Sequence, residues 1–313
     1  MIAACIGLND AGVAHARAFA VASNCELAGV YDADAAVAAK IGTSLGVPVF
    51  TSPNDLLKTA KPDLVVVRVP LPERTTIVRN ALTAGCHVIS ATPISEDDDE
   101  LASIAELARK KGLACAGDFH LRFNPAMDAS HRWIAEGQIG IPLFINGSLC
   151  NGIGDMPDDL FFSLGAHGVD ILRSFVGEVT HVQCFHADSG QSAQVNLRFA
   201  NDCVGNLTLS HEQTMRHPFA RLEYAGKVGR LTIENVYEEA TLFVHDNPDK
   251  IVTVNSIFGG VPQLSQTYGF RSAALIAAIE AGDIDKEVDD VVAAQRIMRA
   301  AVQSAETGEV IEI

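Results

Sequence analysis

Apolar runs alternate with stretches of helical periodicity along the first 120 residues of the chain. Runs at 2–7, 25–32, 62–70, 87–90 and 113–119 have the length and composition of strands. Helical patterns separate them, and the pattern at 75–84 ends at Gly85, a common helix C-terminal signal. Strands that alternate with helices at this spacing predict right-handed crossovers and a parallel, doubly wound α/β sheet.

The pattern changes after Pro125. A helix near 126–140, a strand near 142–150 and a helix near 158–177 precede seven short alternating segments between 180 and 255, and two helices follow. Such a run of short strands predicts a large, mostly antiparallel open sheet. We therefore expect a nucleotide-type, Rossmann-like domain over residues 1–121 and an open α+β domain over residues 122–313. The closing helices can pack back on the first domain.

Composition narrows the class of protein. A formal net charge of −16 argues against nucleic acids and anionic membranes as partners, because both need a basic footprint. No apolar run reaches the ~18 residues of a membrane span. The seven cysteines occur singly, which predicts neither a disulfide framework nor a zinc site. With no basic leader at the N-terminus, we expect a cytoplasmic protein. The acidic stretch 95–100 predicts a first helical turn, capped by Ser95.

A glycine turn follows the first predicted strand. The stretch GLNDAG, from Gly7 to Gly12, has the first and third glycines of the dinucleotide-binding pattern G-x-G-x-x-G, but Asn9 replaces the second. Asn9 would crowd the phosphates or hydrogen-bond one of them. Asp32 ends the second strand, where a carboxylate binds the ribose hydroxyls of NAD and repels the 2′-phosphate of NADP. The alternative is a tight turn followed by a helix-capping aspartate.

A histidine on a later helix is a candidate for proton transfer. In the stretch GAHGVD, His167 precedes Asp170 by three residues, so both lie on one helix face. A histidine there can act as a general acid or base near neutral pH. The spacing alone favours a histidine that is hydrogen-bonded for structural reasons.

Eight motifs in order resemble one known family, and they extend over essentially the whole chain. They are GLNDAGVAHARAF, ELAGVYD, VVVRVPLPER, NALTAGCHVISATP, LRFNP, GQIG, LGAHGVDILRSFVG and YAGKVGRLTIE. The resemblance is to the glucose–fructose oxidoreductase/inositol dehydrogenase/MocA family of NAD(P)-dependent sugar oxidoreductases. It implies a Rossmann domain and a second domain, for substrate binding and oligomerisation, whose open sheet builds a homodimer or homotetramer.

The chain departs from this family at its usual catalytic positions. Family members commonly carry Glu-Lys-Pro where this chain has Ala91-Thr92-Pro93, and an aspartate where it has Ser163. The resemblance therefore implies His167 as the acid/base, with Thr92 or Ser163 bonding the reacting oxygen. The coenzyme contacts expected are Gly7, Leu8, Asn9, Ala11, Gly12, Asp32, Arg68, Pro70, Thr92 and Pro93.

Two arginines also depart from the family pattern. Arg68 replaces a small residue and Arg74 a histidine. Arg68 could approach Thr92 and supply the missing positive charge, although a guanidinium does not give up its proton. It could instead bind the coenzyme pyrophosphate or a substrate carboxylate. The third alternative is a packed stem with its head at the surface.

The remaining substrate candidates come from the domain junction and the loop after it. Arg122 matches a family position there, with either a substrate or a structural role, and Asp118 lies beside it. The substrate contacts expected are His120, Arg122, Asn124, Asn151 and His167. Asp155 and Asp158 lie in the same loop as Asn151, and His211 is treated as structural. Asp118, His120 and His167 lack any metal-ligand spacing, so we expect no metal site.

These features predict an NAD-dependent oxidoreductase acting on a sugar, polyol or small hydroxy or keto compound, with NADP less favoured because of Asp32. Two alternatives stay open because the usual lysine is Thr92 and the usual aspartate is Ser163. One is a non-redox lyase, hydratase or isomerase on the same scaffold, and the other is a non-catalytic ligand sensor.

Overall fold

A computed structural model of the chain describes residues 1–151, 159–213, 219–235, 238–255 and 264–313. The chain forms two compact units. The first comprises residues 1–120 and 264–292, and the second comprises residues 121–263 and 293–313. Among the described residues, no helix is both long and apolar enough to cross a membrane.

The first unit is built around a parallel sheet of five strands in the order β2-β1-β3-β4-β5. Its strands are β1 (Ile2–Ile6), β2 (Glu26–Tyr31), β3 (Leu64–Val67), β4 (His87–Ser90) and β5 (Cys115–Gly117). Its helices are α1 (Asp10–Val21), α2 (Ala35–Leu45), α3 (Pro53–Ala60), α4 (Leu71–Ala84), α5 (Asp98–Lys111) and α8 (Ser265–Ala281). The predicted doubly wound α/β sheet is confirmed.

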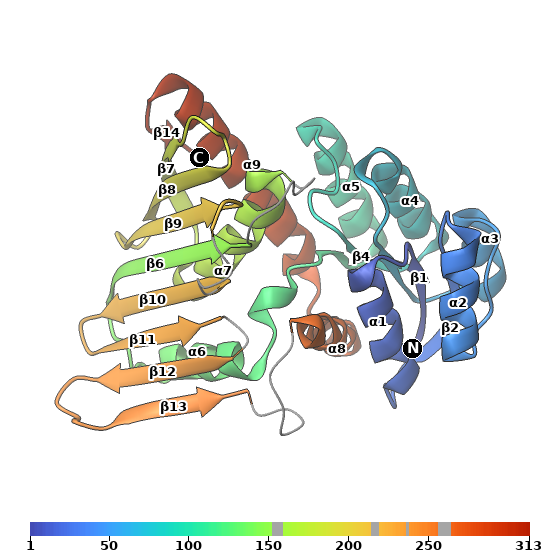
Figure 1. The fold of residues 1–313 in the computed structure, drawn as a ribbon, viewed down its shortest axis with the longest axis horizontal. Coiled ribbons are helices and arrows are strands. Elements are labelled where there is room, and N and C mark those ends of the chain that lie inside the picture. The colour runs from blue at the N-terminus through green and yellow to red at the C-terminus, as the bar shows by residue number, and fades with distance from the viewer. Residues whose placement is uncertain (152–158, 214–218, 236–237, 256–263) are drawn as a thin grey trace. The chain divides into compact units, whose positions relative to one another are not determined.

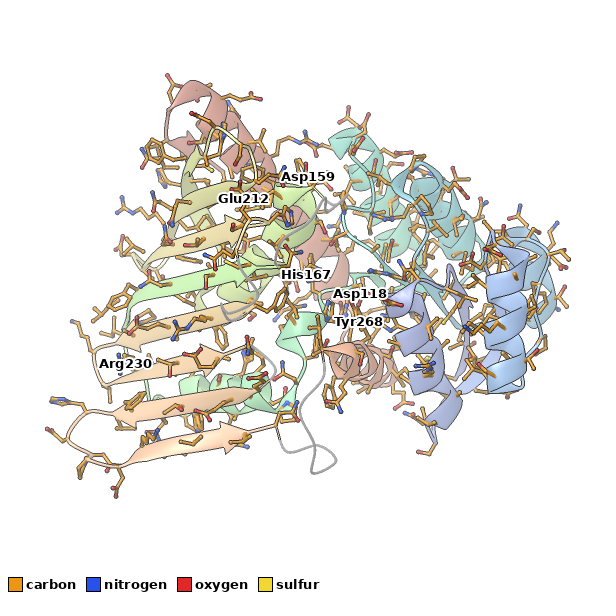
Figure 2. The ribbon with its side chains drawn as sticks, in the orientation of Figure 1. Asp118, Asp159, His167, Glu212, Arg230 and Tyr268 are labelled. Carbon is orange, nitrogen blue, oxygen red and sulfur yellow. The ribbon has the colours of Figure 1, made fainter. Side chains whose placement is uncertain are left out.

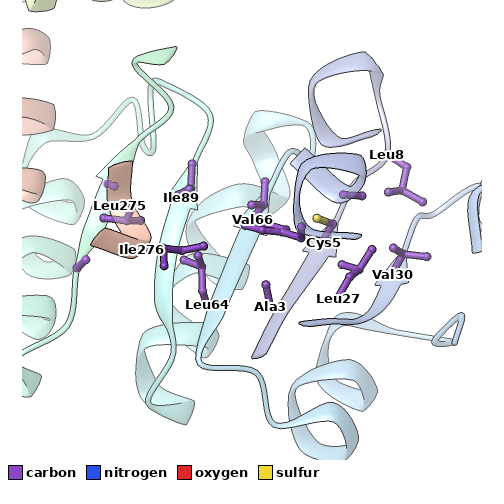
Figure 3. Close-up of a cluster of buried hydrophobic side chains, with 14 of the residues drawn as sticks. Ala3, Cys5, Leu8, Leu27, Val30, Leu64, Val66, Ile89, Leu275 and Ile276 are labelled. Carbon is purple, nitrogen blue, oxygen red and sulfur yellow. The ribbon is translucent and has the colours of Figure 1, made fainter. Parts of the chain in front are cut away.

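The core of this unit explains why its strands carry continuous apolar runs. All four residues of β3 are fully buried, because helices cover the sheet. Leu275 and Ile276 of α8 pack into the same cluster as Ala3, Val66 and Ile89, although they are far away in sequence (Figure 3). Gly85 adopts the left-handed conformation at the end of α4, as the sequence predicted.

The predicted cap of α5 is wrong by two residues. Asp97, not Ser95, caps this helix, because its carboxylate accepts from the backbone N–H groups of Asp99 and Glu100. Ser95 lies before the cap, where its hydroxyl accepts from Asp97 N and donates to the Glu100 carboxylate. The cluster of carboxylates therefore begins the helix as expected, but Asp97 and not Ser95 occupies the capping position.

The second unit contains a sheet of nine strands in the order β13-β12-β11-β10-β6-β9-β8-β7-β14 (Figure 1). The strands are β6 (Pro142–Cys150), β7 (Val179–His186), β8 (Ser192–Phe199), β9 (Val204–Ser210), β10 (Ala220–Gly226), β11 (Gly229–Glu234), β12 (Glu239–Val244), β13 (Lys250–Val254) and β14 (Ile311–Glu312). Every neighbouring pair is antiparallel except β6 and β9, which run parallel. The mostly antiparallel sheet is confirmed.

Helices and short helical turns complete this unit and carry the candidate site residues. They are η1 (His120–Arg122), of which His120 belongs to the first unit, α6 (Pro125–Ala135), a π-helical segment η2 (Leu160–Gly165), α7 (Ala166–Val176) and α9 (Asp285–Thr307), which begins in the first unit. Helix α7 packs on β6 and β9, and α6 packs on β12 and β13. β14 has two residues, too few for a sequence pattern, and pairs with β7.

Candidate functional site

The glycine turn between β1 and α1 is tight enough to require both of its glycines. Gly7 has φ = 90°, and a Cβ built on it would lie 2.4 Å from the Arg68 carbonyl oxygen. A Cβ on Gly12 would lie 2.1 Å from the Gly7 oxygen. Asn9 caps α1 by accepting from Gly12 N at 3.0 Å. The turn therefore leads directly into a helix N-terminus, which favours an anion.

Asp32 is fixed against this turn. Its carboxylate accepts from Leu8 N at 2.6 Å and from Asp34 N at 2.9 Å. The helix α2 that follows is capped by Asp34, so the capping alternative does not describe Asp32. Asp32 thus places a partly buried carboxylate beside the glycine turn, at the carboxyl end of β2.

A buried polar network lies at the carboxyl ends of β3 and β5 (Figure 2). Asp118 Oδ2 accepts from Arg68 Nη1 at 3.0 Å and lies 3.1 Å from His15 Nε2 of α1. His15 Nδ1 in turn meets the Ser272 hydroxyl of α8 at 2.7 Å. Burial opposes the charge of Asp118, but His15 and Arg68 outweigh it and hold the pKa of this carboxyl well below its usual range.

Ser272, His15 and Asp118 have the connectivity of a nucleophilic triad, but their burial excludes that chemistry. Ser272 is 2% exposed, His15 is fully buried and Asp118 is 1% exposed, so no substrate carbonyl can reach the hydroxyl in this structure. The network instead connects α1, β3, β5 and α8. Asp118 was only a flanking residue in the sequence, because its partners are 103 and 50 residues away.

Two predicted substrate residues are buried and have their partners within their own units. His120 approaches the Thr267 hydroxyl at 2.5 Å and stacks on Tyr268 with ring centroids 4.0 Å apart (Figure 2). Asn124 is 1% exposed and caps α6 by accepting from Ala126 N and Met127 N. The structure thus shows structural contacts for both side chains.

The turn that replaces the family's Glu-Lys-Pro is held by α4. Arg74 donates to the carbonyl oxygens of Val69 and Pro93, and the Thr75 hydroxyl donates to Ile94 O at 3.1 Å. Thr92 and Pro93 are half-buried and joined by a cis peptide bond. Pro70 is exposed immediately before α4. Arg74 therefore bonds both of the turns that follow β3 and β4, and no local sequence pattern predicts this role.

In the second unit, Arg122 is held by α7. Its Nη1 donates to Asp170 Oδ1 at 2.9 Å, and its guanidinium lies 5.1 Å from the Phe123 ring centroid. Asp170 is 1% exposed. His131 of α6 stacks on Phe175 at 4.6 Å. Burial, followed by the charge of Arg122, lowers the pKa of His131.

His167 stands in the first turn of α7 and is half-buried (Figure 2). Ser163 precedes it by four residues in η2, which Asp159 caps by accepting from Phe161 N and Phe162 N. Asp170 lies on the same helix one turn after His167, and its carboxylate bonds Arg122 of η1. The second unit therefore groups an imidazole and an ion pair along one helix.

Asn151 pairs with a residue that the sequence treated as structural. Its Oδ1 meets Nδ1 of His211, which is 3% exposed. The contact arises because β6 and β9 are parallel neighbours, so their carboxyl ends coincide and Asn151 N donates to Ser210 O at 3.1 Å. Asp155 and Asp158 lie outside the described residues.

A parallel sheet, a glycine turn and an acidic residue after β2 define an NAD-binding Rossmann fold. Residues 2–119 match the model of the oxidoreductase family with an NAD-binding Rossmann fold, GFO_IDH_MocA. Residues 2–119 are therefore similar to that family of oxidoreductases, and the resemblance seen in the sequence is confirmed.

Known relatives agree in class. UDP-N-acetylglucosamine 3-dehydrogenase of Acidithiobacillus ferrooxidans is 25% identical over 69% of this chain and 68% of its own. The scyllo-inositol 2-dehydrogenase (NAD(+)) of Bacillus subtilis is 25% identical over 57% of this chain and 55% of its own. A solved NAD binding oxidoreductase from Klebsiella pneumoniae superposes with a TM-score of 0.89 at 18% identity, covering 100% and 99% of the two chains. That similarity confirms the fold.

Proposed function

We propose that this protein is an NAD-dependent dehydrogenase or reductase of a sugar, polyol or small hydroxy or keto compound. The observation that carries the proposal is the pairing of the glycine turn with Asp32, whose carboxylate accepts from Leu8 N at 2.6 Å. The curated relatives, a nucleotide-sugar dehydrogenase and an inositol dehydrogenase, support the substrate class.

The residues of the first unit fit the coenzyme. Backbone approaches so closely at Gly7 and Gly12 that a Cβ at either would meet a carbonyl oxygen, which is typical of a turn that receives a pyrophosphate. Asp32 would accept from the ribose hydroxyls and repel a 2′-phosphate, so we propose NAD in preference to NADP. When bound, the nicotinamide accepts or supplies the hydride.

His167 is the proposed proton acceptor in the oxidation direction. A neutral imidazole can take the hydroxyl proton of the substrate near pH 7 and return it in the reverse direction. Thr92 and Ser163 are proposed to hydrogen-bond the reacting oxygen, since neither hydroxyl can act as a base at that pH. The protein's contribution is thus to orient the substrate and move one proton.

The open face of the nine-stranded sheet is proposed as the subunit interface of a homodimer or homotetramer. The centre of this face is polar, with ion pairs between Arg221 and Glu234 at 2.7 Å and between Arg230 and Glu223 at 3.1 Å. A shallow cavity of about 440 Å³ lies between them. Light scattering checks this proposal, because a monomer at micromolar concentration would contradict it.

Coenzyme binding tests the central proposal. NAD and NADH should raise the melting temperature of the wild type more than NADP does. Asp32→Ser should reduce this difference, whereas Asp34→Ser, which preserves the cap of α2, should not. Equal or stronger stabilisation by NADP would contradict the assignment.

Turnover separates the remaining alternatives. Reduction of NAD in the presence of one of a panel of sugars, polyols and hydroxy acids is the expected result. Binding of NAD without turnover of any of them would favour the sensor or the non-redox enzyme, which the replacement of lysine by Thr92 motivates.

A further inference from the structure

Arg68 follows β3 at the switch point of the parallel sheet, between β1 and β3, and its side chain extends toward β5. Its backbone contacts the glycine turn, since a Cβ on Gly7 would lie 2.4 Å from its carbonyl oxygen. Its Nη1 reaches Asp118, which follows β5. In the sheet order β3-β4-β5, β4 lies between the strands that carry the two partners. The ion pair therefore spans the carboxyl end of β4, since strands that are two positions apart in a sheet are separated by ~10 Å.

This direction separates Arg68 from the part of the edge that a coenzyme diphosphate would occupy. Asp32, the proposed ribose ligand, follows β2, and helix α1, whose N-terminus is proposed to receive the diphosphate, follows β1. A dinucleotide held by these residues would cross the switch point, and its reacting half would then lie on the side of β3 and β4. The guanidinium reaches toward β4 and β5 to bond Asp118, so it would lie on the side of the reacting half and of the substrate.

The other arginines near this edge have their donors engaged. Arg74 donates to the carbonyl oxygens of Val69 and Pro93, and Arg271 donates to Gly117 O and to the Glu287 carboxylate. Arg68, by contrast, donates to a side chain of the described residues through Nη1 alone, to Asp118, and its own side chain is 18% exposed. A guanidinium held at one nitrogen keeps N–H groups for a second carboxylate.

The ion pair between Arg68 and Asp118 positions the Arg68 side chain more than it stabilises the fold. Asp118 is 1% exposed, and an ion pair taken out of water to this extent gives little net stabilisation. His15 Nε2 approaches the same carboxylate oxygen at 3.1 Å, so Asp118 is fixed from α1 as well. The pair therefore holds the long Arg68 side chain in one orientation.

We propose that Arg68 is a specificity-determining residue that binds a carboxylate of the substrate, so that the preferred substrate is a hydroxy acid or sugar acid and not the neutral sugar. The inference rests on the proposed NAD-dependent function. It also explains what replaces the cation missing at Thr92: a charge that binds the substrate but takes no part in proton transfer.

Matched substrate pairs test the inference in the NADH complex. Binding of D-glucuronate against D-glucose, D-galacturonate against D-galactose, and D-glycerate against glycerol is measured by calorimetry. A charge-assisted contact predicts that the wild type binds the preferred acid about ten- to a hundredfold more tightly than its neutral partner. Arg68→Met should abolish that preference and Arg68→Lys should restore part of it. Arg79→Met should leave it unchanged, because Arg79 is a half-buried arginine on α4 that bonds Ser103.

Each outcome decides the matter. Equal binding of acid and neutral partner across all pairs overturns the inference, as does a preference that survives Arg68→Met. Loss of NADH affinity in Arg68→Met with the acid preference intact would assign Arg68 to the coenzyme. If NADH does not bind the wild type, the proposed function fails first. Arg68→Gln replaces the methionine variant if circular dichroism shows that the latter is unfolded.

Discussion

The two units build their sites in opposite ways. In the first unit, the proposed coenzyme edge is made mainly of backbone: the turn around Gly7 and the start of α1, with the Asp32 carboxylate bonded to Leu8 N. In the second unit, the site is made of side chains from distant segments, such as Arg122 with Asp170 and Asn151 with His211. Backbone sites depend on short local motifs, whereas side-chain sites depend on tertiary register.

The largest effect is expected in the second unit, at His167. Removing a general acid/base typically costs ~10²–10⁴-fold in rate, so His167→Ala should lower kcat by that range. Coenzyme affinity should stay the same, because the coenzyme edge belongs to the first unit. Steady-state kinetics and NADH titration measure the two quantities.

An exposed histidine of the same unit provides the control for His167. His186→Ala, at the end of β7, should leave kcat unchanged. If His167→Ala retained wild-type kcat, the proposed acid/base role of His167 would be wrong, and another residue would have to transfer the proton.

The next largest effect is expected at the backbone of the glycine turn. Gly12→Ala places a Cβ 2.1 Å from the Gly7 carbonyl oxygen, where only a backbone shift can relieve the clash. Overpacking of this kind costs about 1–3 kcal/mol of unfolding free energy, and the same shift should abolish NAD binding. Urea unfolding and NADH titration check both results.

A second glycine of the same unit controls for this substitution. In Gly269→Ala on α8, the new Cβ would meet only Ala18 Cβ, at 3.4 Å. The helix should gain about 0.5–1 kcal/mol because alanine loses less backbone entropy. A Gly12→Ala variant that bound NAD normally would show that the turn has room to spare and would remove the main support for the coenzyme site.

The same contrast decides how much could be read from the sequence. The first unit was predictable because buried parallel strands leave apolar runs, and the tight turn demands glycine at positions 7 and 12. The nine-stranded sheet could be predicted as mostly antiparallel, but the parallel pairing of β6 with β9 leaves no local signal. The partnership of Asn151 with His211 depends on that pairing.

Charged residues of the first unit were also hard to place from the sequence. Asp118 pairs with Arg68 and His15 only once β3, β5 and α1 converge. Sequence reasoning brought Arg68 toward Thr92, because β3 and β4 are neighbours, but the structure bonds its guanidinium to Asp118. A long side chain can reach past the adjacent strand, so strand order alone does not identify its partner.

The smallest expected effect compares the response of the two units to acid. His87 of the first unit accepts from Ala114 N at 2.9 Å, and burial lowers its pKa. Burial, followed by the charge of Arg122, lowers the pKa of His131 in the second unit. Since the unfolded chain binds these protons near pH ~6.5 and the folded chain resists them, their stabilisation is complete above that pH and is lost as pH falls toward the folded pKa. Each histidine should cost less than ~1.4 kcal/mol per pH unit.

Urea unfolding at pH 7.5 and 5.5 measures this loss in each unit, because the protein's one tryptophan, Trp133, lies in α6 and its fluorescence reports the second unit. His131→Phe, which keeps a ring against Phe175, should weaken the pH dependence of the fluorescence transition. His87→Gln should do the same for the transition followed by circular dichroism, which includes the first unit. His245→Ala, an exposed histidine, should change neither slope. If both core variants kept the wild-type slopes, the acid sensitivity between pH 7.5 and 5.5 would have to come from other groups. Asp118 is not one of them: its pKa lies well below its usual range, so its contribution is lost only in stronger acid, below pH ~4.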